Sequence, residues 1–220
     1  MTAVSDRLIT GAPGETVHRD AVDGFGAVTV RVLDPEGDLA TIHRWVTAPR
    51  ARFWGLEALT ADELRDLYAY VDGLATHHAF LVCRDEVPFA LLQTYVPEHD
   101  PVGECYHPAP GDVGLHFFLG EQVGTREQQW AVLVRTIVAF VLGPPSAQRI
   151  VVEPDVGNAR ALAILDMLGF ALGPEIVLPD KTARLAFLGR ERADLLLARA
   201  TGELGGAPVR QEGLTGDPHG

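Results

Sequence analysis

The sequence predicts an α/β fold in which helices cover both faces of one mixed, mostly antiparallel sheet. Three segments in the second half of the chain carry this prediction. Residues 111–120 are apolar and aromatic, residues 128–143 repeat apolar side chains at three- and four-residue steps, and residues 149–154 form another short apolar run. Strand, crossover helix and strand in this order predict a right-handed parallel βαβ unit.

The segments before this unit predict strands and helices of the first half of the fold. Residues 28–34 alternate apolar and polar side chains, as a first strand would. Asp38 is expected to cap the helix that follows it. Thr60 heads a Thr-Ala-Asp-Glu capping-box pattern and predicts a second helix. Residues 79–98 predict two antiparallel strands joined by a tight turn.

The segments after the unit complete one domain. Residues 158–170 predict a short helix, residues 175–189 a strand pair and residues 190–200 a final helix. We therefore expect an irregular or loosely strand-forming lead at 1–24, a single domain at 25–200, and a flexible tail at 201–220, which is rich in Gly, Pro and charge.

Composition limits the classes of partner. The formal charge of -12 argues against nucleic acid and anionic membranes and is compatible with a small cationic molecule. Cys83 and Cys105 lie far apart without metal-ligand spacing, so reduced thiols and no metal are expected. No apolar run reaches the ~18 residues of a membrane span, and the first residues lack the blocks of a signal peptide. A cytoplasmic protein is expected.

In a parallel βαβ unit the site normally lies at the C-terminal ends of the strands. That point corresponds to residues 120–126, with Asp155 and Asn158 at the end of the neighbouring strand.

Several segments resemble those of a known family. Residues 158–170, NARALAILDMLGF, resemble the Asn-x-x-Ala segment with its closing Gly-Phe in the GNAT N-acetyltransferase superfamily. Four segments, HRWVTAPRARFWGL, DVGLHFFLG, EPDVGNARA and LPDKTARLAFLGRER, together resemble its siderophore-biosynthesis branch. Members of that branch acylate the side-chain amine of lysine or ε-N-hydroxylysine. The resemblance thus implies a GNAT-like sheet with a splayed parallel strand pair.

The resemblance also implies a co-substrate, an acyl thioester on CoA or on an acyl carrier protein, with no tightly bound cofactor. Its pantetheine arm would lie in the gap between the splayed strands, where free backbone groups need partners. A backbone N–H there could stabilise the oxyanion, and N–H groups at the next helix N-terminus suit a pyrophosphate. The implied donor-binding residues are Phe118, Leu119, Gly120, Gly124, Thr125, Arg126, Asn158 and Ala161.

His116 and Asp155 are the candidate catalytic residues. A lone histidine in a strand is ordinarily structural, and Asp155 suits a turn or a helix cap. The resemblance instead favours His116 as general base, because lysine has a pKa of ~10.4 and its amine must be neutral to attack. Asp155 would then orient or charge His116, or hold the incoming ammonium.

Three residues are candidates for contact with the acceptor. Phe53 and Trp54 could be core residues, but their position in a loop suggests a wall over the aliphatic stem of a lysine-like amine. Gln93 is placed there by its position before the central strand.

Two departures from the family pattern keep other functions open. The expected pyrophosphate loop, residues 122–126, has one glycine fewer than usual, and Leu165 stands where many GNAT enzymes have a tyrosine that protonates the leaving thiolate. Water or the substrate could supply that proton. The alternatives are an aminoglycoside N-acetyltransferase and a GNAT-like module that binds a ligand without turnover.

Overall fold

The computed structural model describes residues 6–200, in which eight strands form one sheet in the order β1-β2-β3-β4-β5-β6-β8-β7. The strands are β1 (Thr16–Val22), β2 (Gly26–Val32), β3 (His77–Arg84), β4 (Val87–Tyr95), β5 (Asp112–Leu119), β6 (Arg149–Val152), β7 (Ala171–Val177) and β8 (Thr182–Gly189). The helices are α1 (Leu39–Val46), α2 (Ala61–Asp72), α3 (Arg126–Val141), α4 (Ala159–Leu168) and α5 (Arg190–Ala200). The tail expected at 201–220 lies outside the described residues.

Two local expectations were wrong. The strand expected to be the first of the sheet is the second, because the lead expected to be irregular or loosely strand-forming contains β1, which pairs with β2 in antiparallel register. Asp38 precedes α1 but makes no capping hydrogen bond. Its carboxylate instead accepts two bonds from the guanidinium of Arg31, at 2.6 and 2.7 Å, because a buried charge is best matched by a bidentate partner. The capping box of Thr60 with Glu63 is confirmed.

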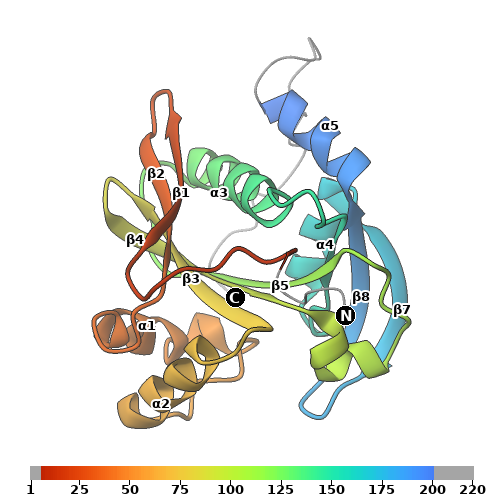
Figure 1. Cartoon of the computed structure of the whole chain (residues 1–220), viewed down its shortest axis with the longest axis horizontal. Helices are drawn as coiled ribbons and strands as arrows, with labels where there is room; N and C mark the ends of the chain where they lie inside the picture. Colours follow the sequence, from red (N-terminus) through yellow and green to blue (C-terminus); the bar gives the residue numbers. More distant parts are fainter. Residues whose placement is uncertain (1–5, 201–220) are drawn as a thin grey trace, which may run out of the picture.

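The helices form layers on the two faces of the sheet (Figure 1). On one face α1 and α2 bury a cluster that includes Trp45, Leu64 and Tyr68. On the other face α3, α4 and α5 pack over a larger core that includes Leu133, Leu165 and Ala193. The predicted three-layer α/β architecture is confirmed.

The parallel pair in the middle of the sheet opens into a fork. β5 and β6 pair in only three places, and the last of these is Gly114 with Val151. Beyond this point β5 runs on to Leu119 beside β4 alone. At the closed end Asp112, which is fully buried, accepts two bonds from Arg149, at 2.7 and 2.8 Å. The expected splayed parallel pair is therefore present.

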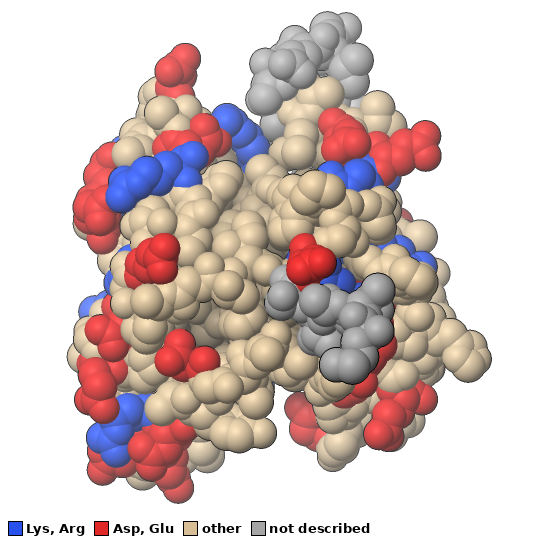
Figure 2. Space-filling model, in the orientation of Figure 1, with Lys and Arg blue, Asp and Glu red and all other residues tan. Residues whose placement is uncertain are grey.

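The charges on the surface are mixed. Figure 2 shows one face, on which Asp and Glu side chains lie at the margin and also within the face, and Lys and Arg side chains form small groups among them. Such a face gives a polyanion no broad basic surface to bind. Within residues 6–200, no helix combines the length and the apolar character needed to cross a membrane.

Candidate active site

The open end of the fork holds a histidine and a buried glutamate. His116 lies on β5, two residues beyond the last pairing with β6, and Glu153 directly follows β6. Nε2 of His116 contacts Oε1 of Glu153. The histidine side chain is 36% exposed and that of the glutamate 3%, so the imidazole faces the opening and the carboxylate lies behind it.

Glu153 is held by two further groups. Its Oε2 accepts a hydrogen bond of 2.9 Å from the hydroxyl of Tyr95, and Nζ of Lys181 lies 3.4 Å from Oε1. Burial raises the pKa of this carboxyl, but His116, Lys181 and Tyr95 favour its charged form and lower the pKa to about 2. Glu153 is therefore an anion at neutral pH.

The charge of Glu153 determines the state of His116. Burial lowers the pKa of His116, but the attraction and hydrogen bond of Glu153 outweigh burial, so that pKa lies above its ordinary value. Because a carboxylate only accepts, Nε2 must donate to it. In the neutral ring Nδ1 then carries the lone pair, and it makes no hydrogen bond to the rest of residues 6–200. This arrangement is that of a base ready to accept a proton.

The structure corrects the partner expected for His116. Asp155 was expected to orient the imidazole, but its Oδ1 accepts a 2.7 Å bond from the backbone N–H of Gly157. The reason is that β6 ends at Val152 and Pro154 begins a turn, in which Asp155 bridges to the backbone of Ala183. Asp155 therefore stabilises the turn into α4, and Glu153 is the carboxylate that contacts His116.

Tyr95 reaches Glu153 by passing over a glycine. A Cβ added to Gly114 would lie 2.1 Å from the tyrosine ring. We predict that Gly114→Ala lowers the free energy of unfolding by about 1–3 kcal/mol, because a buried ring cannot give way. Gly189→Ala is the control, since nothing lies near its added Cβ. Urea unfolding measures both, and equal stabilities of the two variants would contradict the prediction.

A cavity of about 220 Å³ opens beside His116 on the α2 face of the sheet. Its walls include Val71, His77, Gln93, Tyr95 and Asp100. Gln93 was expected near the acceptor and lines this cavity, where its amide donates to the hydroxyl of Tyr68 at 3.3 Å.

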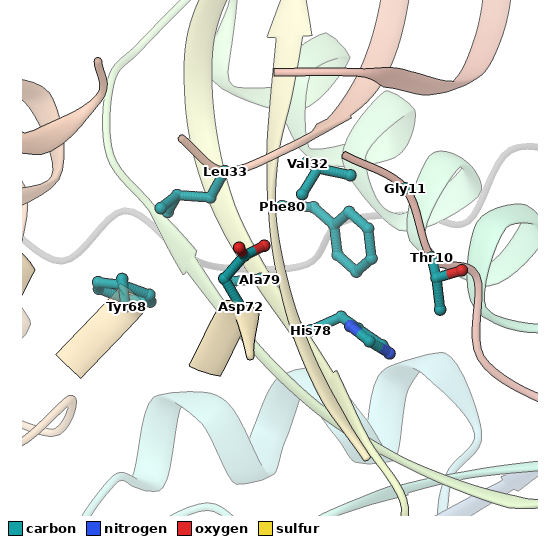
Figure 3. Close-up of a pocket in the computed structure, with 9 residues that line it drawn as sticks. All are labelled: Thr10, Gly11, Val32, Leu33, Tyr68, Asp72, His78, Ala79 and Phe80. Atoms are coloured by element: carbon teal, nitrogen blue, oxygen red, sulfur yellow. The ribbon is translucent and has the colours of Figure 1, made fainter. Parts of the chain in front are cut away.

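A second hollow, of about 260 Å³, lies farther along α2 and at the ends of β2 and β3 (Figure 3). Thr10, Asp72 and His78 lie around it together with the ring of Tyr68. Neither His116 nor Glu153 lines this hollow. We therefore place the candidate active site at the smaller cavity, which His116 lines.

The loop between α1 and α2 covers the site. Trp54 packs edge-on against the ring of His116, with centroids 6.3 Å apart, and against Phe118 at 5.8 Å. Phe53 is 39% exposed, and its ring lies close to Gly157 at the entrance to α4. Trp54 therefore lies against the β5 side of the fork, and Phe53 lies near its other side, where α4 begins. Trp54 is a wall beside the base, and Phe53 lies at the rim.

The family of the chain follows from comparison with known sequences. The family model described as "Acetyltransferase (GNAT) domain" matches residues 34–178, well over half of the chain. The chain belongs to the GNAT acetyltransferase family. Both the fork and the helical layers described above lie largely within the matched residues.

The individual proteins to which the chain is similar share less than a third of its residues over the aligned lengths. N(6)-hydroxylysine O-acetyltransferase of Escherichia coli is 28% identical over 167 residues, which are 74% of this chain and 52% of that protein. A protein of Schizosaccharomyces pombe, provisionally named as a lysine N-acyltransferase, is 24% identical over 176 residues, 78% of this chain and 52% of its own. The chain spans about half the length of these curated relatives.

The solved structures show the same fold. The aminoglycoside acetyltransferase AAC(6')-Ib, in complex with an aminoglycoside and acetyl-CoA, superimposes with a TM-score of 0.64. It is 22% identical, and the match covers 76% of this chain and 96% of that one. At this identity the likeness establishes the GNAT fold alone.

The edge of the GNAT fork offers fewer free backbone groups than expected. The N–H of Gly120 donates to the carbonyl of Phe89 at 2.8 Å, and its carbonyl accepts from Arg50. Because hydrogen-bonded pairs alternate along antiparallel strands, Phe118 is also bonded to β4, and the free groups belong to Phe117 and Leu119. The expectation for Leu119 is thus compatible with this edge, whereas the backbones of Phe118 and Gly120 already have partners.

The loop before α3 is the expected GNAT pyrophosphate position. Gly124 adopts a φ of 79°, and the side chain of Thr125 caps α3 by accepting from the N–H of Gln128. Arg126 begins the helix and is exposed. Arg84 was not anticipated: its guanidinium lies beside Gly124, over the ring of Phe25 at 4.5 Å. A second cationic side chain therefore lies close to this loop, although Arg84 precedes Gly124 by forty residues in the sequence.

The remaining expected donor residues lie at the start of α4. The side chain of Asn158 caps this helix by accepting from the N–H of Ala161 at 3.2 Å, so both residues are tied to one local bond. Leu165, at the position of the common GNAT tyrosine, is only 6% exposed and belongs to the core. Among residues 6–200 there is no cluster of three or more His, Cys, Asp or Glu that could hold a metal ion.

Proposed function

We propose that the protein transfers an acyl group from an acyl thioester to the side-chain nitrogen of lysine or ε-N-hydroxylysine, as a step in siderophore biosynthesis. The observation that carries this proposal is the contact between His116 and Glu153 at the open end of the fork, beside a cavity. A base at this point can take the proton from an amine that enters the cavity while a thioester lies along the free edge of β5.

The chemistry needs little beyond a neutral nucleophile and a polarised carbonyl. His116 takes the proton from the amine through Nδ1, and Glu153 stabilises the imidazolium that results. The free N–H groups of Phe117 and Leu119 are the donors placed to stabilise the oxyanion. The thiolate of the donor is a good leaving group, with a pKa of roughly 8 to 9 by analogy with Cys, so solvent or the imidazolium supplies its proton without a tyrosine.

The size of the cavity and the names of the relatives support a small acceptor. Sites for drug-sized ligands measure ~300–1,000 Å³, and this cavity has about 220 Å³. That favours a lysine-like amine over an aminoglycoside, which remains the alternative because of the structural likeness to AAC(6')-Ib. The names of the two curated relatives contain hydroxylysine and lysine, which supports the same acceptor class.

The donor in this proposal is acyl-CoA, with an acyl carrier protein as the alternative carrier. Arg84 and Arg126 near the loop before α3 would place positive charge close to a pyrophosphate. A carrier protein presents the same pantetheine arm, but on a protein surface. We also propose that the protein works in the cytoplasm.

An assay of thiol release from acetyl-CoA tests the proposal. We expect release with lysine or ε-N-hydroxylysine and none above background with kanamycin. Acetyl-CoA at about 100 times its Kd should also stabilise the fold by ~2.7 kcal/mol, measured as a rise in Tm. Release with kanamycin alone would select the aminoglycoside alternative. A rise in Tm without release to any amine would select a binding module.

A further inference from the structure

The acceptor cavity beside His116 is also lined by an acidic side chain, Asp100. Asp100 lies between two short 3₁₀-helices, Pro97–His99 and Pro101–Glu104, and is 24% exposed. Its negative charge contributes to raising the pKa of His116, which lines the same cavity. The site described above assigns no role to Asp100.

The two oxygens of Asp100 are engaged unequally. Oδ1 accepts a hydrogen bond of 3.0 Å from the N–H of Val102 and so caps the second 3₁₀-helix. Among residues 6–200, Oδ2 contacts only Nε2 of His77, at the long distance of 3.4 Å. This second oxygen therefore keeps most of its capacity to accept hydrogen bonds.

The surroundings hold Asp100 in place. His77 stacks on the ring of Tyr95, with centroids 5.6 Å apart and planes 12° apart, and its Nδ1 contacts Oγ1 of Thr76 at 2.9 Å. The loop itself is tight, because a Cβ at Gly103 would lie 2.1 Å from the carbonyl oxygen of Pro97. A carboxylate fixed in this way is preorganised to bind a ligand, which lowers the entropic cost of binding.

The two carboxylates near His116 differ in how well they are paired. Glu153 is matched by Lys181 and His116. Within residues 6–200, Asp100 makes an ion-pair contact with His77 alone, at 3.4 Å. The wall of the cavity also includes Val71, Gln93 and the aromatic Tyr95, against which a short aliphatic chain can pack.

We propose that Asp100 binds a second cationic group of the acceptor, so that the substrate is a short aliphatic chain with the attacked nitrogen at His116 and an ammonium at Asp100. This inference rests on the proposed acyl transfer and adds to it the feature by which the acceptor is selected. A lysine-like molecule meets the requirement through its α-ammonium. The new bond is a charge-assisted N–H···O contact, the strong kind in proteins.

Binding of a matched pair of amines tests the inference. Cadaverine and n-pentylamine have the same chain, and only cadaverine has an ammonium at both ends. Isothermal titration calorimetry of the full chain should show cadaverine binding at least roughly 10-fold tighter, the effect of one hydrogen bond to a charged group. In Asp100→Asn this preference should be lost, while the amide oxygen still accepts from Val102. Asp66→Asn, which removes an exposed charge on α2, should keep the preference.

The outcomes separate this inference from the acyl transfer itself. Equal affinities of the two amines for the wild type, no measurable binding of either, or a preference that survives in Asp100→Asn would overturn the role of Asp100. Thiol release from acetyl-CoA, measured with the same two amines, reports on transfer alone. A preference in binding without any thiol release would leave Asp100 as the cation subsite and refute the transfer.

Discussion

The His116→Ala variant is expected to turn over at least ~100-fold more slowly than the wild type, which is the usual contribution of a positioned base. Without the imidazole, nothing at the fork takes the proton from the amine as it attacks. The variant should bind donor normally, because His116 lies on the acceptor face. Steady-state thiol release measures the rate, and the rise in Tm on addition of acetyl-CoA measures donor binding.

A control variant at another histidine and a second, less basic acceptor make this test more specific. His107→Ala removes an exposed imidazole from the loop before β5 and should leave turnover unchanged. The loss in His116→Ala should be larger with lysine than with ε-N-hydroxylysine, since a hydroxylamine is far less basic and needs less help to become neutral. An unchanged rate with both acceptors would remove His116 from the chemistry.

Replacing Glu153 by glutamine should lower kcat/KM by at least roughly 10-fold, because the carboxylate that orients a catalytic histidine is worth up to ~10⁴ in a Ser-His-Asp triad. It should also change the pH profile. The pKa of His116 is depressed by burial and raised more strongly by Glu153, so it falls when the carboxylate is removed. The rise of kcat/KM with pH should therefore occur at lower pH in Glu153→Gln than in the wild type.

The wild type and Glu153→Gln are compared with the same acceptor, so that titration of the acceptor amine contributes equally to both pH profiles. Glu175→Gln is the control: it removes an exposed carboxylate that pairs with Arg184 on β8 and should shift neither rate nor profile. A reduced rate with an unshifted profile would mean that Glu153 supports the fold alone.

The same carboxylate makes the stability of the fold depend on pH. The pKa of Glu153 is about 2 in the folded protein and 4.5 in its ordinary state, so its contribution is complete above 4.5 and is lost as the pH falls toward 2. Between these limits the unfolding free energy should fall more steeply for the wild type than for Glu153→Gln. Urea titrations at several pH values would show the difference between the two slopes.

The sheet and its helices were predictable because local pattern and tertiary structure agree along most of the chain. The run around His116 is apolar enough to require a buried strand, and the spacing from Trp130 to Val141 requires a helix. β1 was not predicted as a definite strand because TVHRDAV mixes charges with apolar residues, as an edge strand with only one neighbour can.

The site was only partly predictable, because its parts come from separate segments. His116 stood out as a polar residue inside an apolar strand. Asp155 was predicted as the carboxylate at the site because it was expected to end the strand, but the alternation of side chains stops being informative where Pro154 turns the chain. The sequence signal that could have identified Glu153 is a lone carboxylate directly after three buried residues. Asp100 comes to line the cavity, and Arg84 to lie beside Gly124, only through packing between distant elements, which no local pattern encodes.

The fork has a consequence for selectivity among thioesters. Backbone N–H and C=O groups at the edge of a sheet pair only with the amide groups of the ligand beside them, and every pantetheine arm has the same amide groups at the same spacing. In the proposed reaction, pairing of the arm with Phe117 and Leu119 would therefore not distinguish CoA from a carrier protein. That distinction would depend on the loop before α3, near Arg84 and Arg126, and substitutions there could change the preferred carrier without altering the environment of His116.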